Sequence, residues 1–134
     1  MKAITLLTGI LILTFNCSLA QDLSAEDRKV QIFTYEEKAN LQTWYNEELQ
    51  RMNFSEEEES QYNSILYYYI AKIARLDDKD QDFTEAEFKA KLNEYLAKQE
   101  ADLKEILSPE QMDIHRDIYG EFLRSAYRRW GIEQ

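Results

Sequence analysis

The stretch Leu107-Ser108-Pro109-Glu110-Gln111 is a strong signal for the first turn of a helix and sets the fold class of this chain. Ser108 can accept a hydrogen bond from a free backbone amide, and Gln111 can reach back to the cap. Pro109 takes the first helical position, where its missing N–H costs nothing. Similar starts occur at Ser24-Ala25-Glu26-Asp27, Thr34-Tyr35-Glu36-Glu37, Ser55-Glu56-Glu57-Glu58 and Thr84-Glu85-Ala86-Glu87. With three glycines and one proline, the chain is predicted to be all-α.

Apolar residues recur at helical spacing after four of these starts and predict four helices. The stripe of the first helix is Leu41, Trp44, Tyr45, Leu49 and Met52. The helices are expected from Tyr35 to about Met52, Ser55 to near Leu76, Thr84 to about Leu107, and Pro109 to Trp130, with Gly131 as the end of the last. The links at 53–54 and 108–109 are so short that the chain must bend sharply or reverse. We expect a kinked antiparallel helical hairpin of about four helices, not a compact bundle of equal legs.

Residues 1–20 have the features of a secretion signal. Lys2 is followed by an apolar run from Ile4 to Phe15, and Ser18-Leu19-Ala20 offers small residues for cleavage before Gln21. The predicted organisation is a signal peptide at 1–20 and a single helical domain at 21–134, exported to the periplasm or secreted. A permanent N-terminal anchor and a lipid-modified Cys17 are the less favoured alternatives. Cleavage would remove the one cysteine of the chain.

The charge of the chain is strongly negative. The sequence has 26 acidic and 16 basic residues, a formal charge of −10. All 26 acids and 15 of the basic residues follow residue 20, so the segment 21–134 carries −11. Such a surface repels nucleic acid and anionic membranes, and no later stretch is apolar enough to insert into a membrane. It favours cations or basic polypeptides as partners.

The charged break at 77–82 contains the candidates for a metal site, Asp78, Asp80 and Asp82, which alternate as in a calcium loop. The spacing of an EF-hand fails, because Phe83 stands in place of the required glycine and Lys89 in place of the bidentate glutamate. We therefore interpret the segment as an acidic, solvated loop before a helix and assign no metal site.

His115 is the one histidine and lies on or beside the apolar stripe of the last helix. A single imidazole without a cysteine partner is a poor zinc or copper site, so we expect it at the boundary between core and solvent. No Ser, Thr or Cys stands in a nucleophile motif. We expect no enzymatic activity and no cofactor.

Leu107, Ser108 and Gln111 resemble the Leu-Thr-x-x-Gln signature of the Spy/CpxP family of periplasmic proteins, with Ser in place of Thr. In that family the signature occurs twice, each time opening a helix. The second site here would be Phe54, Ser55 and Glu58, with Phe in place of Leu and Glu in place of Gln. The resemblance spans about residues 36 to 120. It implies a thin, cradle-shaped dimer of helical hairpins that acts as an ATP-independent chaperone, an envelope-stress modulator or a metal-responsive protein.

We therefore expect a non-enzymatic binding protein of the cell envelope that holds client polypeptides on an apolar face. The client- or partner-binding residues are predicted from the apolar side chains left over once the main stripes are buried: Tyr67, Tyr68, Ile70, Tyr127 and Trp130. The same surplus predicts a homodimer with a two-fold interface. Two alternatives stay open, a divalent-cation sensor or buffer that uses the 77–82 loop, and a structural or regulatory envelope protein that docks on one specific partner.

Overall fold

A computed structural model describes residue 24 and residues 28–133 of the chain. Its elements are α2 (Tyr35–Leu49), the 3₁₀ helix η1 (Gln50–Met52), α3 (Glu56–Ala74), α4 (Glu85–Lys104) and α5 (Pro109–Trp130). These described residues contain no strand, which confirms the predicted all-α class. The predicted signal peptide, Cys17 and positions 25–27 of the first helix start lie outside the described residues.

Each of the four helices α2 to α5 begins with the predicted capping box. At α5, the Ser108 hydroxyl accepts a hydrogen bond from the Gln111 amide (3.2 Å), and Gln111 Oε1 accepts one from the Ser108 amide (3.0 Å). The other three reciprocal pairs are Thr34 with Glu37, Ser55 with Glu58, and Thr84 with Glu87. Each cap of this kind stabilises its helix by about 1 kcal/mol. The residue at which each helix starts is therefore determined by hydrogen bonds within its first turn.

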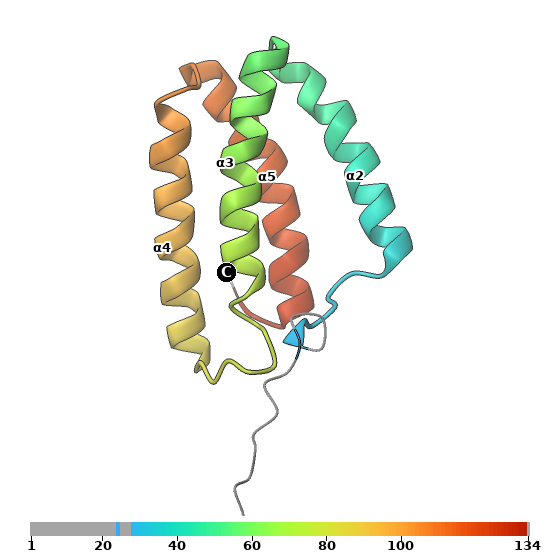
Figure 1. The fold of residues 1–134 in the computed structure, drawn as a ribbon, viewed down its shortest axis with the longest axis vertical. Helices are drawn as coiled ribbons and strands as arrows, with labels where there is room; N and C mark the ends of the chain where they lie inside the picture. Colours follow the sequence, from blue (N-terminus) through green and yellow to red (C-terminus); the bar gives the residue numbers. More distant parts are fainter. Residues whose placement is uncertain (1–23, 25–27, 134) are drawn as a thin grey trace, which may run out of the picture.

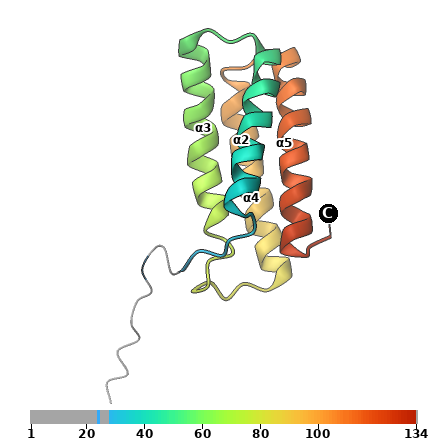
Figure 2. The ribbon, with the colours of Figure 1, turned by 90° about the vertical axis from the view of Figure 1, so that its right-hand side faces the viewer.

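The links between consecutive helices reverse the chain, so the four helices run alternately up and down (Figure 1). The view turned by 90° shows the same alternation (Figure 2). Asn53 stands at the first reversal with a φ of 51°, and it is the one non-glycine with a positive φ in the described ranges. Asparagine adopts this left-handed conformation more readily than most residues. At the short links the sequence predicted either a sharp bend or a reversal of the chain, and the structure shows a reversal.

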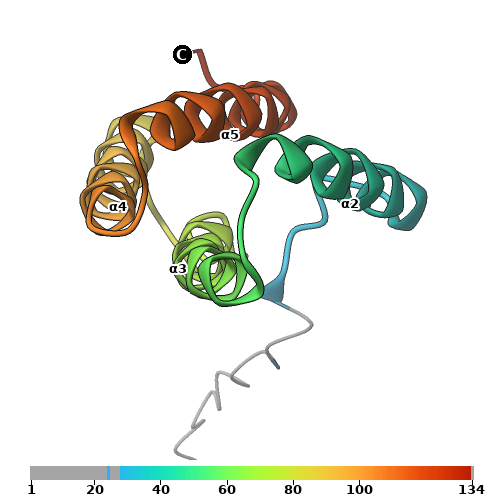
Figure 3. The same ribbon diagram turned by 90° about the horizontal axis from the view of Figure 1, so that it is seen from above.

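Helix α2 stands apart from the other three helices. Seen from above, α5 runs along one side, with α4 near one of its ends and α2 near the other, and α3 faces α5 (Figure 3). Helix α2 meets the other helices at its C-terminal end and diverges from α3 toward its N-terminus (Figure 1). Leu49 is the one residue of α2 that is buried. The arrangement is an antiparallel hairpin of α3 and α4, backed by α5, with α2 attached at the edge.

The buried side chains form two clusters along the helices. The larger one includes residues of all four helices and of η1: Leu49, Met52, Tyr62, Leu66, Leu103, Leu107, Met112 and Tyr119. The smaller one lies near the loop that precedes α4 and contains Ile73, Leu76, Phe88 and Leu92. None of the described helices combines the length and the apolarity that spanning a bilayer requires.

Candidate binding site

The five predicted client-binding residues do not form one exposed face. Tyr67 and Tyr68 are exposed on α3, at 59% and 57% of their surface. Ile70 is half-buried against the larger core cluster. Tyr127 and Trp130 are half-buried against the smaller cluster. Two of the five residues are therefore exposed, and the other three are partly covered by the core clusters.

Trp130 is held in place by the loop before α4, which the helix periodicity did not reveal. Its indole Nε1 donates a hydrogen bond to Asp77 Oδ2 at 2.8 Å, and its ring meets Phe88 edge-on at 5.1 Å between centroids. A buried indole N–H needs such a partner. The charged break thus supplies a polar anchor for the end of α5, and Trp130 serves the fold of the monomer.

The residues that resemble the family signature lie together at one end of the molecule. Phe54 packs against Tyr62 at 5.2 Å between ring centroids, and Leu107 belongs to the same cluster. Gln111 does more than cap α5, since its Nε2 also donates to the carbonyl of Met52 at 3.1 Å. The Gln111 side chain therefore ties the start of α5 to η1. Both signature sites have a structural role here.

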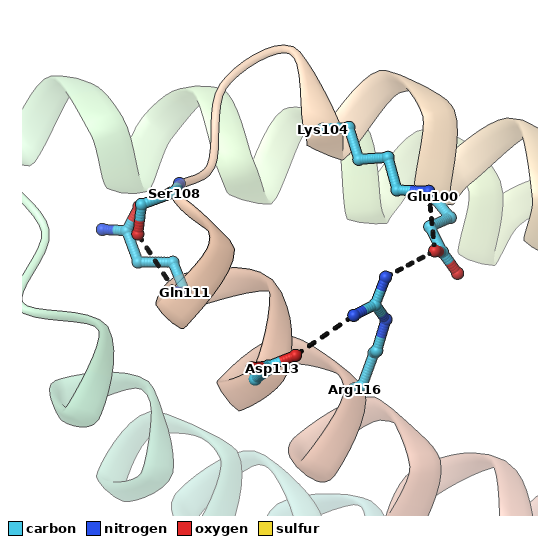
Figure 4. Close-up of polar contacts among 6 residues, drawn as sticks. All are labelled: Glu100, Lys104, Ser108, Gln111, Asp113 and Arg116. Carbon is cyan, nitrogen blue, oxygen red and sulfur yellow. Dashed lines mark hydrogen bonds and ion pairs between the residues drawn. The ribbon is translucent and has the colours of Figure 1, made fainter.

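Figure 4 shows the charged side chains that border the start of α5. Arg116 binds Glu100 at 2.7 Å and Asp113 at 3.1 Å, and Lys104 binds the same Glu100 oxygen at 3.1 Å. A shallow pocket of about 380 Å³ lies beside them, lined by Leu107 and Met112 among others. Because both cations already have carboxylate partners, this pocket offers no free charge to a ligand.

The three aspartates that were considered as metal ligands have different surroundings. Asp78 is buried and accepts a hydrogen bond from Arg75 Nε at 3.4 Å, although it was expected in a solvated loop. Asp80 lies 3.7 Å from Arg28, and Asp82 is exposed. Within residue 24 and residues 28–133, no three His, Cys, Asp or Glu side chains are grouped so that they could hold a metal ion.

His115 is buried, with 4% of its surface exposed, so the prediction of a boundary histidine is wrong. The Tyr62 hydroxyl is hydrogen-bonded to His115 Nδ1 at 2.8 Å, and the Tyr119 ring stacks on the imidazole at 5.3 Å. Burial lowers the pKa of His115 to about 4, because the charged form loses its hydration. The imidazole is therefore a neutral part of the core. In the sequence, His115 precedes Ile118 by three residues and Phe122 by seven, which puts it on the apolar face of α5. This spacing could have indicated that His115 is buried.

The structure instead reveals a half-open apolar groove between α2 and α5. Its volume is about 330 Å³, and Phe33, Leu41 and Trp44 supply its apolar lining. Leu41 and Trp44 were assigned to the buried stripe of the first helix, but both are half-exposed because α2 diverges from the other helices. Sequence periodicity located this face correctly and could not tell that it is only partly covered.

Arg129 is one of the residues that line the groove. Its guanidinium binds both carboxylate oxygens of Glu37, at 2.5 and 3.2 Å. It also donates to the carbonyl of Ile32 at 3.2 Å and lies over the Phe33 ring at 5.2 Å. The Arg129 contact, together with the hydrogen bond from Thr34, lowers the pKa of Glu37 to about 2. We call this set of contacts, made by Ile32, Phe33, Glu37 and Arg129, the Arg129 latch.

Comparison of the sequence with models of known families finds no match, and comparisons with curated proteins and with solved structures find none either.

Proposed function

We propose that this chain is a non-enzymatic binding protein that holds apolar segments of client polypeptides in the groove between α2 and α5. The observation that supports the proposal is the half-open groove itself, in which Leu41 and Trp44 keep part of their surface in contact with water. Covering such side chains is favourable by about 25 cal/mol per Å² of apolar area. The groove is shallow and open, which suits side chains of a long chain better than a small, enclosed ligand.

The charge of the protein indicates which clients it would prefer. The chain carries a formal charge of −10, so it attracts basic polypeptides and repels acidic ones over about one Debye length. We therefore propose clients that combine apolar segments with a net positive charge. Placement in the cell envelope rests on the signal-like features of residues 1–20 and on the resemblance to the Spy/CpxP family.

An aggregation assay tests this proposal. Equimolar protein should suppress light scattering by reduced lysozyme, a basic client, more strongly than by reduced α-lactalbumin, an acidic one. Trp44→Ala should lose most of this suppression, because it removes the largest side chain of the groove. Tyr35→Ala is the matched control, since Tyr35 is 90% exposed and does not line the groove. Circular dichroism confirms that both variants remain helical. Unchanged aggregation of both clients, or full activity of Trp44→Ala, would refute the proposal.

A homodimer is a further part of the proposal. Its support now comes from Tyr67 and Tyr68, which are the large exposed side chains of α3. Light scattering by the protein alone at micromolar concentration measures the mass. A mass of one protomer that persists at high salt would exclude the dimer.

A further inference from the structure

Helix α2 is held firmly at one end and weakly at the other. At its C-terminal end, Leu49 and Met52 are 5% and 2% exposed and belong to the larger core cluster. Between the two ends, Leu41 and Trp44 are half-exposed. Tyr45 packs against the larger core cluster, and the hydrogen bond from its hydroxyl to Asn63 Oδ1 of α3 is long at 3.4 Å. At its N-terminal end, the Arg129 latch makes the connection to α5.

The junction between α2 and η1 has the properties of a hinge. The Met52 carbonyl accepts a hydrogen bond from Gln111 Nε2 at 3.1 Å, so η1 stays attached to α5. The backbone changes from α-helical to 3₁₀ hydrogen bonding at Gln50. The hydrogen bonds of a 3₁₀ segment have poorer geometry than those of an α-helix, so the chain bends more easily at η1 than within α2. Opening about this end of α2 would move the N-terminal half of the helix, with Leu41, while Leu49 and Met52 stay in the larger core cluster.

The ion pair of the Arg129 latch is open to water, whereas Phe33 of the latch is 7% exposed and its ring lies 6.3 Å from that of Phe122. The side chains of Arg129 and Glu37 are 40% and 36% exposed. Water and salt compete with ion pairs at such positions, which makes their contribution small. The ion pair between Arg129 and Glu37 is therefore the contact of α2 that releases first.

We propose that α2 is a hinged cover over the polypeptide-binding surface, closed by the Arg129 latch. Opening would expose the inner face of α2, with Leu41 and Trp44, and the side of α5 that carries Phe122, whose ring now lies 6.3 Å from that of Phe33. The ligand of this surface, an apolar segment of a basic polypeptide, rests on the proposed function above. The cover itself rests on the contacts of α2.

Glu37→Gln is the variant that tests the latch. Glutamine still completes a capping box, so the start of α2 is retained while the charge that Arg129 binds is removed. Glu36→Gln is the matched control, because it removes the same charge from the neighbouring residue, which is exposed. Hydrogen–deuterium exchange is measured for α2 and, as an internal reference, for α4. We expect exchange in α2 of Glu37→Gln to be about two- to fivefold faster, the range for loss of an exposed ion pair, and exchange in α4 to be unchanged.

Arg129→Gln provides the second variant, with exposed Arg128→Gln as its control. The double variant Glu37→Gln/Arg129→Gln should show no greater effect than the larger of the two single changes, because both remove the same contact. Exchange in α2 that is equal in Glu37→Gln, Arg129→Gln and their controls would overturn the hinged cover.

Binding of reduced, alkylated lysozyme gives an independent readout. If the cover limits access, the apparent affinity of Glu37→Gln should rise by the same factor as its α2 exchange, since more molecules are in the open state. Weaker binding despite faster exchange would overturn the cover, because α2 would then be a fixed wall of the site. If wild type and variants all fail to bind, the proposed function fails, while the exchange data still decide whether the latch exists.

Discussion

Mild acid should destabilise this protein through His115. The imidazole is 4% exposed and lies among Tyr62, Tyr119 and apolar side chains of the larger cluster. Burial lowers its pKa to about 4; Glu100 opposes this shift and Arg116 adds to it. In the unfolded chain the pKa returns to about 6.5. As the pH falls, the unfolded state therefore binds the proton first.

The sign and size of the effect follow from this difference. The contribution of neutral His115 to stability is fully present above pH 6.5 and is lost as the pH falls toward 4. At pH 5.5, one unit below the unfolded pKa, the loss is about 1.4 kcal/mol. The full loss, reached below pH 4, is about 3 kcal/mol. Glu37, Glu94 and Glu100 have lowered pKa values and stay ionised at pH 5.5.

Urea unfolding followed by circular dichroism at pH 7.5 and 5.5 measures the change in the free energy of unfolding. His115→Gln is the comparison, because glutamine is neutral at both pH values and can still hydrogen-bond to Tyr62. The difference between the two pH values should be about 1.4 kcal/mol larger in wild type than in the variant. Equal pH dependence in the two proteins would refute the reasoning and place His115 in contact with water.

Two further results are expected. Gln111→Ala should lower the free energy of unfolding by about 1–2 kcal/mol, because it removes two hydrogen bonds of the side chain, the one that Oε1 accepts from the Ser108 amide and the one that Nε2 donates to the Met52 carbonyl. Urea unfolding measures this, exposed Glu110→Ala is the control, and an equal loss in both would show that the Gln111 contacts contribute nothing. Calorimetry with calcium or zinc should give no saturable heat from the 77–82 loop, because Asp78 and Asp80 are paired with Arg75 and Arg28; saturable heat that disappears in Asp80→Asn would contradict this expectation.

The helix starts could be read from the sequence, whereas the exposure of particular side chains could not. The boxes at Thr34, Ser55, Thr84 and Ser108 each involve residues within one turn, and all four are confirmed. In the first helix, periodicity also identified Leu49 and Met52, which are buried in the core. It could not indicate that α2 diverges from α3, because that depends on how the links between helices orient whole helices.

The sequence by itself determined the all-α class, the four helix starts and the apolar face of each helix, since these depend on hydrogen bonds and spacings among residues a few positions apart. Only the tertiary structure decided that His115 is buried, that Trp130 finds Asp77, and that Trp44 stays half-covered in a groove. It also brought Glu37 to Arg129, which are 92 positions apart. Such contacts arise when helices pack, and the local pattern of one helix carries no information about which neighbour covers it or how completely.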